Sequence, residues 1–282
     1  MSTETLQCNE AGLDQWTDSV RFEVERDRLI QYAVATNDPI AAHRAGDVAA
    51  PVFAIVPVFE ALLEPALAVV PLSVLGRVLH GEQEFRFHRP IRPGDVLVSR
   101  GKMTGFEGLP NGTRCCTYLE TRDEDGDLLV EQYVTSFVRG FDDGRRIGEL
   151  SPAHKLDESL REAATAAEFT QHVDEDQTLR YSPASGDPMP IHLDEQVARD
   201  VGLPGIIAHG FCMLAFASWG ILDELGGGDV SRLKRLAVRF SKPVLPGQDI
   251  HTRVWETGPG VYAFETDVDG TAVLRDGLAE VA

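Results

Sequence analysis

The chain contains one sequence pattern twice, and this duplication constrains the fold more than any other feature. Residues 32–43 (YAVATNDPIAAH) align without gaps with residues 181–192 (YSPASGDPMPIH) at an offset of 149, and tyrosine, aspartate, proline and histidine match. Residues 85–94 (FRFHRPIRPG) align with residues 238–247 (VRFSKPVLPG) at an offset of 153. Two colinear blocks that differ by a four-residue insertion predict two copies of one supersecondary unit.

The 282 residues can accommodate two such units and a connection between them. We expect an N-terminal repeat over 1–141, a linker over 142–166 and a C-terminal repeat over 167–282. The predicted linker is polar and lacks the apolar periodicity of a core element, although its segment near Glu158–Ala167 favours a partial helix.

Each copy shows an apolar run followed by strands, which favours an α+β fold with an antiparallel sheet. Residues 211–222 are apolar on nearly all sides and predict a buried helix, whereas Pro65 would interrupt the corresponding helix of the first copy. Asp125-Gly126 and Asp269-Gly270 predict hairpin turns. The predicted strands are 81–88, 96–102, 113–121 and 128–138 in the first copy, and 235–240, 249–257, 261–268 and 273–279 in the second.

Charge and composition exclude several classes of partner. The net charge of −19 disfavours nucleic acid and anionic membrane surfaces, because both would be repelled. The first ten residues do not resemble a signal peptide, and no apolar run reaches the ~18–20 residues of a membrane span. We therefore expect a cytoplasmic protein. Its four cysteines have no disulfide or zinc-like spacing and are expected to be reduced thiols: Cys8, Cys115, Cys116 and Cys212.

The second copy carries the residues with the clearest chemical pattern. Asp187 and His192 lie five residues apart around a proline-interrupted turn, and His209-Gly210 stands at the start of the apolar run. An acid/base pair beside a helix N-terminus is what the addition of water to a polarised C=C bond requires. Taken alone, the pair would more often be a surface pair or a helix cap. A metal site that includes Asp194 is disfavoured, because neither HxH nor HExxH spacing is present.

The longer string around this pair resembles the signature of a known family. Residues 186–194 read GDPMPIHLD, and residues 202–210 read GLPGIIAHG. This order and spacing resemble the MaoC-like, (R)-specific enoyl-CoA hydratases (hydratase 2) of the double-hotdog type, in which each antiparallel sheet wraps a buried helix. Met189 departs from the family pattern, which commonly has asparagine there, and this puts substrate preference or rate in doubt.

The resemblance implies a reaction and a set of site residues. Asp187 and His192 would hold a water molecule, and the Gly210 N–H would stabilise the negative charge that develops on a thioester oxygen. The implied substrate is an acyl-CoA or acyl carrier protein thioester, with no metal and no redox cofactor, and family habit adds a homodimer. His209 has a second interpretation, a ring that caps or packs at the helix start. The candidate substrate-binding residues are Tyr181, Met189, Gly205, His209, Arg239 and Lys242.

Arginines in the two repeated Phe-to-Gly segments are further candidates for the CoA phosphates. Their alternative interpretation is solvated charge at the strand ends. These candidates are Arg86, Arg89 and Arg92, beside the Arg239 and Lys242 already named.

The first copy keeps Asp38 and His43 at the same spacing. The resemblance implies chemistry in the C-terminal copy only, with the N-terminal copy shaping the acyl-chain pocket. Asn37 replaces Gly186, no His-Gly follows, and residues 54–57, where the oxyanion donor would fall, are apolar and end in proline. A vestige is therefore favoured over a second active site. Two other functions stay open for the whole chain: a hotdog acyl-CoA thioesterase, and an inactive acyl-thioester-binding subunit.

Overall fold

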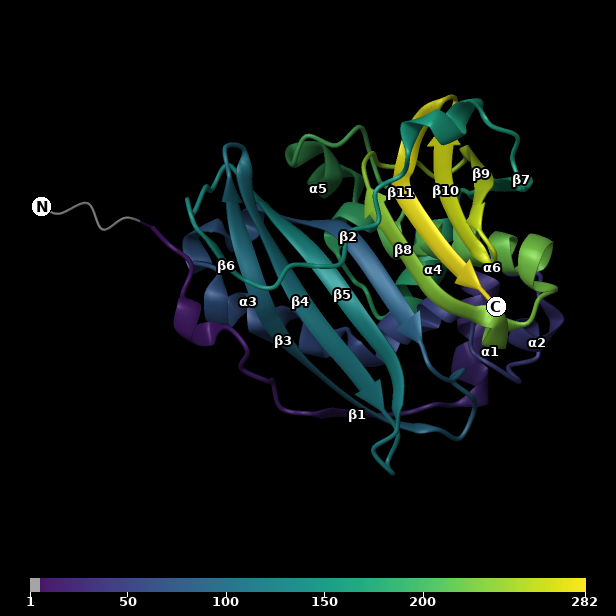
Figure 1. Cartoon of the computed structure of the whole chain (residues 1–282), viewed down its shortest axis with the longest axis horizontal. Helices are drawn as coiled ribbons and strands as arrows, with labels where there is room; N and C mark the ends of the chain where they lie inside the picture. The colour runs from purple at the N-terminus through teal and green to yellow at the C-terminus, as the bar shows by residue number, and fades with distance from the viewer. Residues whose placement is uncertain (1–5) are drawn as a thin grey trace, which may run out of the picture.

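The computed structural model describes residues 6–282, apart from the side chain of Glu60, and shows one continuous antiparallel sheet with the α-helices on one side of it (Figure 1). The strand order is β1-β3-β4-β5-β2-β8-β11-β10-β9-β7, and the short strand β6 pairs with β3. The first five strands of this order come from the first repeat and the last five from the second. The α+β double-hotdog prediction is confirmed.

The first repeat contributes the broad half of the sheet. All four strands predicted for this repeat are present, and each is longer than the alternating pattern indicated. Two short strands were not predicted, and one of them, β6, lies in the segment predicted as linker. The bounds are β1 (Val20–Glu23), β2 (Val78–Phe87), β3 (Val96–Leu109), β4 (Gly112–Arg122), β5 (Leu128–Arg139) and β6 (Arg146–Gly148).

The second repeat wraps its strands around helix α6 (Gly210–Gly226), which is buried on nearly all sides as its apolar sequence predicts. Gly220 allows close contact between helix and sheet, because a Cβ there would lie 2.3 Å from the Phe169 ring. The helix ends at Gly227, which adopts the left-handed conformation (φ 60°). The strands are β7 (Ala167–His172), β8 (Leu233–Phe240), β9 (Asp249–Gly258), β10 (Val261–Val268) and β11 (Thr271–Val281).

The first repeat has no continuous counterpart of α6. The 3₁₀ segments Pro51–Val58 and Glu60–Leu62 and helix α3 (Leu63–Val69) take its place. Pro65 does not make the break that the sequence predicted, since it lies in the first turn of α3, where proline is tolerated. The regular helix is lost earlier, in the segment that contains Pro57, which has no N–H to donate.

The remaining helical elements are short. The α-helices are α1 (Arg26–Ala35), α2 (Ala41–Arg44), α4 (Gln177–Ser185) and α5 (Glu195–Asp200). The remaining 3₁₀ segments are Glu10–Gly12, Leu72–Arg77, Glu158–Glu162, Pro190–His192 and Val230–Arg232. In residues 6–282 no single helix is long and apolar enough to span a membrane. The bent pair Pro51–Val58 and Leu63–Val69 reaches the length and apolar composition of a span only when the two segments are counted together.

The two repeats are related by an approximate two-fold axis that the sequence offsets identify. In the pairing of β2 with β8, Glu84 lies opposite Ala237, which is the residue 153 positions further along the chain. Tyr32 and Tyr181 are 149 residues apart, which is the offset of the first repeated block. Their hydroxyl groups lie 3.3 Å apart between α1 and α4. Residues that are equivalent in sequence therefore meet at the axis, and β2 and β8 join the repeats into one sheet.

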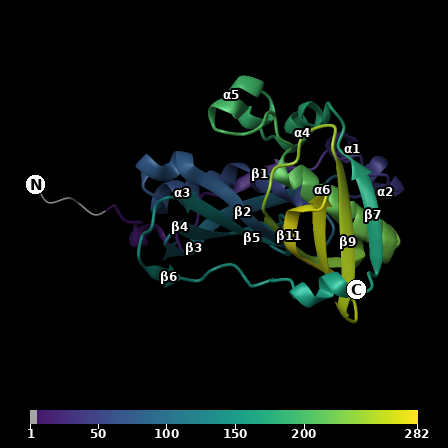
Figure 2. The same cartoon turned by 90° about the horizontal axis from the view of Figure 1, so that it is seen from above.

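The predicted linker runs along the side of the sheet opposite to the helices (Figure 2). Leu156 and Leu160 pack there against Trp255 and Ala263 of the second repeat. The expected partial helix is only a 3₁₀ segment, Glu158–Glu162, and β7 begins at Ala167.

The ion pairs beside the axis give a first prediction. Glu84 is 1% exposed and binds Arg235 at 2.8 Å and Arg86 at 2.7 Å. Glu84→Gln should lower the free energy of unfolding by about 2 kcal/mol, because the mostly buried Arg235 guanidinium loses the charge of its carboxylate partner. Urea unfolding measures this. Glu124→Gln, which removes an exposed pair with Arg21, is the control and should leave stability unchanged; equal effects of the two changes would contradict the prediction.

Candidate active site

Asp187 is placed by the end of helix α4. Gly186 ends that helix in the left-handed conformation (φ 81°), which glycine adopts without strain, and Pro188 then keeps the chain from continuing as helix. The Ser182 hydroxyl donates to the Asp187 main-chain oxygen at 2.7 Å. The Met189 N–H donates to the Asp187 carboxylate at 3.0 Å. The carboxylate is thus fixed through one oxygen.

His192 ends the 3₁₀ segment Pro190–His192 and is 8% exposed. Its Nδ1 lies 2.8 Å from the Ile207 carbonyl oxygen. Because a carbonyl only accepts hydrogen bonds, Nδ1 carries the hydrogen and Nε2 of the neutral ring keeps its lone pair. Burial lowers the pKa of His192 below its usual value, against opposing effects of Ile207 and Asp187. The residue therefore offers a neutral imidazole with a free basic nitrogen.

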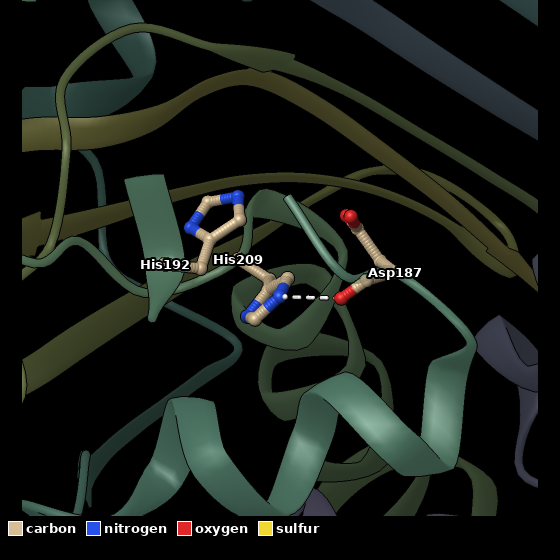
Figure 3. A group of neighbouring side chains, drawn as sticks. All are labelled: Asp187, His192 and His209. Atoms are coloured by element: carbon tan, nitrogen blue, oxygen red, sulfur yellow. Dashed lines mark hydrogen bonds between the residues drawn. The ribbon is translucent and has the colours of Figure 1, made fainter. Parts of the chain in front are cut away.

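The His209 ring packs against one face of the His192 imidazole. The two rings stack with centroids 3.8 Å apart, and His209 Nε2 lies 3.4 Å from the Asp187 main-chain oxygen. In Figure 3 the Asp187 carboxylate and the His192 ring lie on the same side of the His209 ring. Burial and the neighbouring His192 lower the pKa of His209 to about 3. His209 is therefore neutral at physiological pH. Of the two stacked rings, His192 is the one that can gain a proton.

The three side chains lie close enough to share one small ligand. One ligand atom from each of Asp187, His192 and His209 lies within 4.8 Å of the other two. A water molecule between the first two would be within hydrogen-bond reach of both. A metal ion fits less well, because an ion in the plane of one stacked ring would lie well out of the plane of the other. The expectation that the site uses no metal stays a prediction.

Gly210 is the first residue of α6, so its N–H belongs to the positive end of a 17-residue helix. Within residues 6–282, this N–H forms no hydrogen bond to a main-chain acceptor. A Cβ on Gly210 would lie 3.2 Å from the Phe240 ring. The Gly210 N–H is therefore a free hydrogen-bond donor beside the gap between Asp187 and His192. The Phe240 ring forms an aromatic wall next to this donor.

The other residues predicted to bind substrate occupy different surroundings. Tyr181 is 1% exposed and lies behind His209, with its hydroxyl 3.3 Å from that of Tyr32. Met189 is 51% exposed next to Asp187. Gly205 lines a hollow of about 470 Å³ formed by α4, α5 and the loops around them. Tyr181 is therefore placed to support His209, whereas Met189 lies at the surface and Gly205 is buried at the wall of the hollow.

The candidate cations for a phosphate group fall into two sets. Arg86 pairs with Glu84, and Arg89 pairs with Asp95 and Asp123. Arg239 and Lys242 are exposed near the end of β8, and neither has an acidic partner among the described residues. Arg92 donates to the Asp47 main-chain oxygen at 3.4 Å. Arg92, Arg239 and Lys242, which are exposed and have no ion pair among the described residues, therefore remain the candidates for an anionic ligand.

The first copy holds the same acid/base pair in a closed form. His43 Nδ1 donates to Asp38 Oδ2 at 2.7 Å, and both side chains are fully buried. Asp38 also accepts a hydrogen bond from the Ile40 N–H at 2.9 Å. With no gap for water and no access from solvent, this pair cannot serve as a second active site in this conformation.

The structure also corrects where the first copy would carry its oxyanion donor. The Ala49 N–H donates to Ile91 O at 2.9 Å, just as the Ala208 N–H donates to Val244 O at 2.7 Å. The counterpart of Gly210 is therefore Pro51, not a residue of the 54–57 segment as the sequence predicted. The alignment missed this because the repeats differ in length between the two matched blocks. Proline has no N–H, so the donor is lost outright.

Sequence reasoning missed the aromatic wall beside Gly210. His80 of β2 contacts the rings of Phe211 and Phe240, each at a centroid distance of 4.7 Å. Phe211 follows Gly210 in the helix, and Phe240 packs on Gly210 itself. His80 belongs to no motif, and its proximity to the site depends on the pairing of β2 with β8, so no local signal identifies it.

Comparisons with known proteins find relatives over most of the chain. Residues 158–276 match the family profile described as MaoC like domain, and residues 13–132 match that described as FAS1-like, dehydratase domain region. The chain is 32% identical to the probable enoyl-CoA hydratase 2 of Dictyostelium discoideum, covering 72% of this chain and 69% of the relative. It is also 32% identical to the 3-hydroxyacyl-thioester dehydratase Y of Mycobacterium tuberculosis, covering 72% of each.

The chain belongs to the MaoC-like dehydratase family. Its activity is that of a hydro-lyase. The fold matches the crystal structure of the MaoC-like dehydratase from Phytophthora capsici with a TM-score of 0.84 and 25% identity, covering 96% of each chain. A Mycobacterium tuberculosis protein described as a double hotdog, 14% identical with a TM-score of 0.60, covers 94% of each chain and supports the fold alone.

The low pKa of His209 predicts how stability changes with pH. The unfolded chain binds a proton at His209 near pH 6.5, whereas the folded protein does so only near pH 3, so stability falls as pH drops below about 6.5. Between about pH 7.5 and 5 this residue should account for a loss of about 2 kcal/mol. Urea unfolding of the wild type and His209→Asn at both pH values tests this. A variant with the same pH dependence as the wild type would contradict it.

Proposed function

We propose that the protein reversibly hydrates trans-2-enoyl thioesters to (3R)-3-hydroxyacyl thioesters, with Asp187 and His192 as the acid/base pair and the Gly210 N–H as the oxyanion donor. The observation that carries the proposal is the open gap between the Asp187 carboxylate and the free Nε2 of His192, beside the N-terminus of α6. The similarity to a probable enoyl-CoA hydratase 2 and to a 3-hydroxyacyl-thioester dehydratase supports the substrate class.

The mechanism follows from these positions. A water molecule between Asp187 and His192 loses one proton to the pair as its oxygen attacks Cβ. Negative charge moves to the thioester oxygen, where the Gly210 N–H and the helix dipole stabilise it. The pair then returns one proton to Cα on the same face. Because the two groups titrate together, the proton transfers belong to the pair rather than to either residue.

Two functions from other classes make different predictions. A thioesterase would also use water near a helix N-terminus, but it would release free thiol. An inactive binding subunit would bind an acyl thioester without turnover. The open pair in the second repeat favours hydration over the binding role, since a closed pair such as Asp38–His43 would suffice for packing alone.

The thiol carrier and cellular setting belong to the same proposal. Coenzyme A is the proposed carrier, because exposed Arg239 and Lys242 offer cations for its phosphates near β8. We further propose that the enzyme needs no metal or redox cofactor, works in the cytoplasm and forms a homodimer.

The deciding experiment follows the loss of conjugated thioester absorbance with crotonyl-CoA, together with chiral analysis of the product. We expect (3R)-hydroxybutyryl-CoA from the wild type. Asp187→Asn and His192→Gln should each lower kcat by about 100- to 10,000-fold, the range in which general acid–base groups act.

Asp38→Asn serves as the matched control, because it changes the equivalent carboxylate of the first repeat. It should retain the wild-type kcat per folded molecule. Activity that survives both changes in the second repeat and disappears with Asp38→Asn would overturn the site assignment. Release of free thiol without hydroxyacyl product would replace the hydratase with the thioesterase.

A further inference from the structure

The first repeat contains a hollow of its own, which we call the first-repeat hollow. Residues of the segments 49–54 and 87–91 line it from the first repeat, and residues of the segment 230–234 line it from the second. Neither Asp187 nor His192 contributes to its walls, so it is separate from the candidate active site.

The approximate two-fold axis relates this hollow to the candidate active site. Pro51 in its wall is the counterpart of Gly210, as the matching hydrogen bonds at the start of the two helical segments show. Phe87 in its wall is the counterpart of Phe240 at the 153-residue offset. The hollow therefore occupies, in the first repeat, the place that we assign to the thioester in the second.

Small side chains keep the hollow open. Ala50 and Ala54 stand where the second repeat has His209 and Met213. The centre of a water molecule can occupy about 20 Å³ of the space, which exceeds the about 10–15 Å³ that one molecule needs. Water is a poor occupant because the walls are mainly apolar, and an empty space loses packing contacts. An unbranched aliphatic chain is narrow enough to fill it.

One basic side chain at the rim has no anionic partner. Arg89 and His88 are each paired with carboxylates. Lys234 is exposed and donates to the Ser231 carbonyl oxygen at 2.6 Å, but it forms no ion pair in the part of the chain that the structure describes. Its ammonium group is therefore available to a ligand that carries negative charge beside its aliphatic chain.

We propose that the first-repeat hollow is a second ligand site, which binds an unbranched acyl chain that carries negative charge, as acyl-CoA and fatty-acid anions do. The ligand class rests on the proposed function, since the hollow is the counterpart of the proposed thioester site. No hydration takes place there, because Pro51 has no N–H and the Asp38–His43 pair is closed. Each chain thus converts one acyl thioester and holds a second acyl ligand.

Binding stoichiometry tests this inference. Butyryl-CoA is saturated and cannot be hydrated, so titration calorimetry counts the bound molecules without turnover. We expect two molecules per wild-type chain and one per chain of Ala50→Phe, whose ring fills the hollow. Lys234→Glu should also lower the number to one, and it changes only an exposed side chain. Lys155→Glu makes the same charge change at an exposed linker position and should keep two.

Octanoate distinguishes the two sources of the acyl chain. It supplies an unbranched chain and a carboxylate without coenzyme A. If Ala50→Phe loses one equivalent of butyryl-CoA, the ligand is an acyl-CoA. If it loses one equivalent of octanoate only, the site is confirmed and its ligand is a free fatty-acid anion.

A folded Ala50→Phe protein that binds as many molecules of both ligands as the wild type would overturn the inference. If that variant does not fold, the same result with Lys234→Glu decides against it. Failure of the proposed function looks different, because the wild type would then not hydrate crotonyl-CoA, whatever number of ligands it binds.

Discussion

The pairing of β2 with β8 is the contact on which the rest of the structure depends. It joins two half-sheets into one and places Glu84 opposite Ala237 at the axis that relates the repeats. It also sets the distance between the repeats, so that the imidazole of His80 reaches the start of α6. Without this register, the proposed catalytic residues of the second repeat would lack the aromatic side chains that lie on one side of the candidate site.

The two repeats show how one scaffold is divided between chemistry and support. Asp187 and His192 each bind the backbone and leave a gap between them, whereas Asp38 and His43 bind each other. The two histidines differ in the partner of Nδ1: in His192 it donates to a main-chain carbonyl oxygen, and in His43 it donates to the neighbouring carboxylate. Identical residue types at identical spacing thus give an open pair in one repeat and a sealed one in the other.

Sequence patterns predicted the regular parts of this fold well. The segment 261–268 is strand β10 without a change at either end, because alternation over eight residues leaves little ambiguity. The start of β2 was missed because the register shifts between His80 and Glu82, and such a bulge breaks the two-residue period that identifies a strand. His80 belongs to no motif and lies near α6 only through the pairing of β2 with β8, so the sequence could not place it there, whereas Asp187, His192 and Gly210 lie in a local motif whose residues the structure brings together.

Pro51 limits what would be needed for the first repeat to form a second active site. It stands where Gly210 stands in the other repeat, and it begins a 3₁₀ segment in place of a long helix. A second reactive centre would require a residue with an N–H at this position and, separately, the opening of the Asp38–His43 pair. No single substitution therefore gives the first repeat the arrangement of the second.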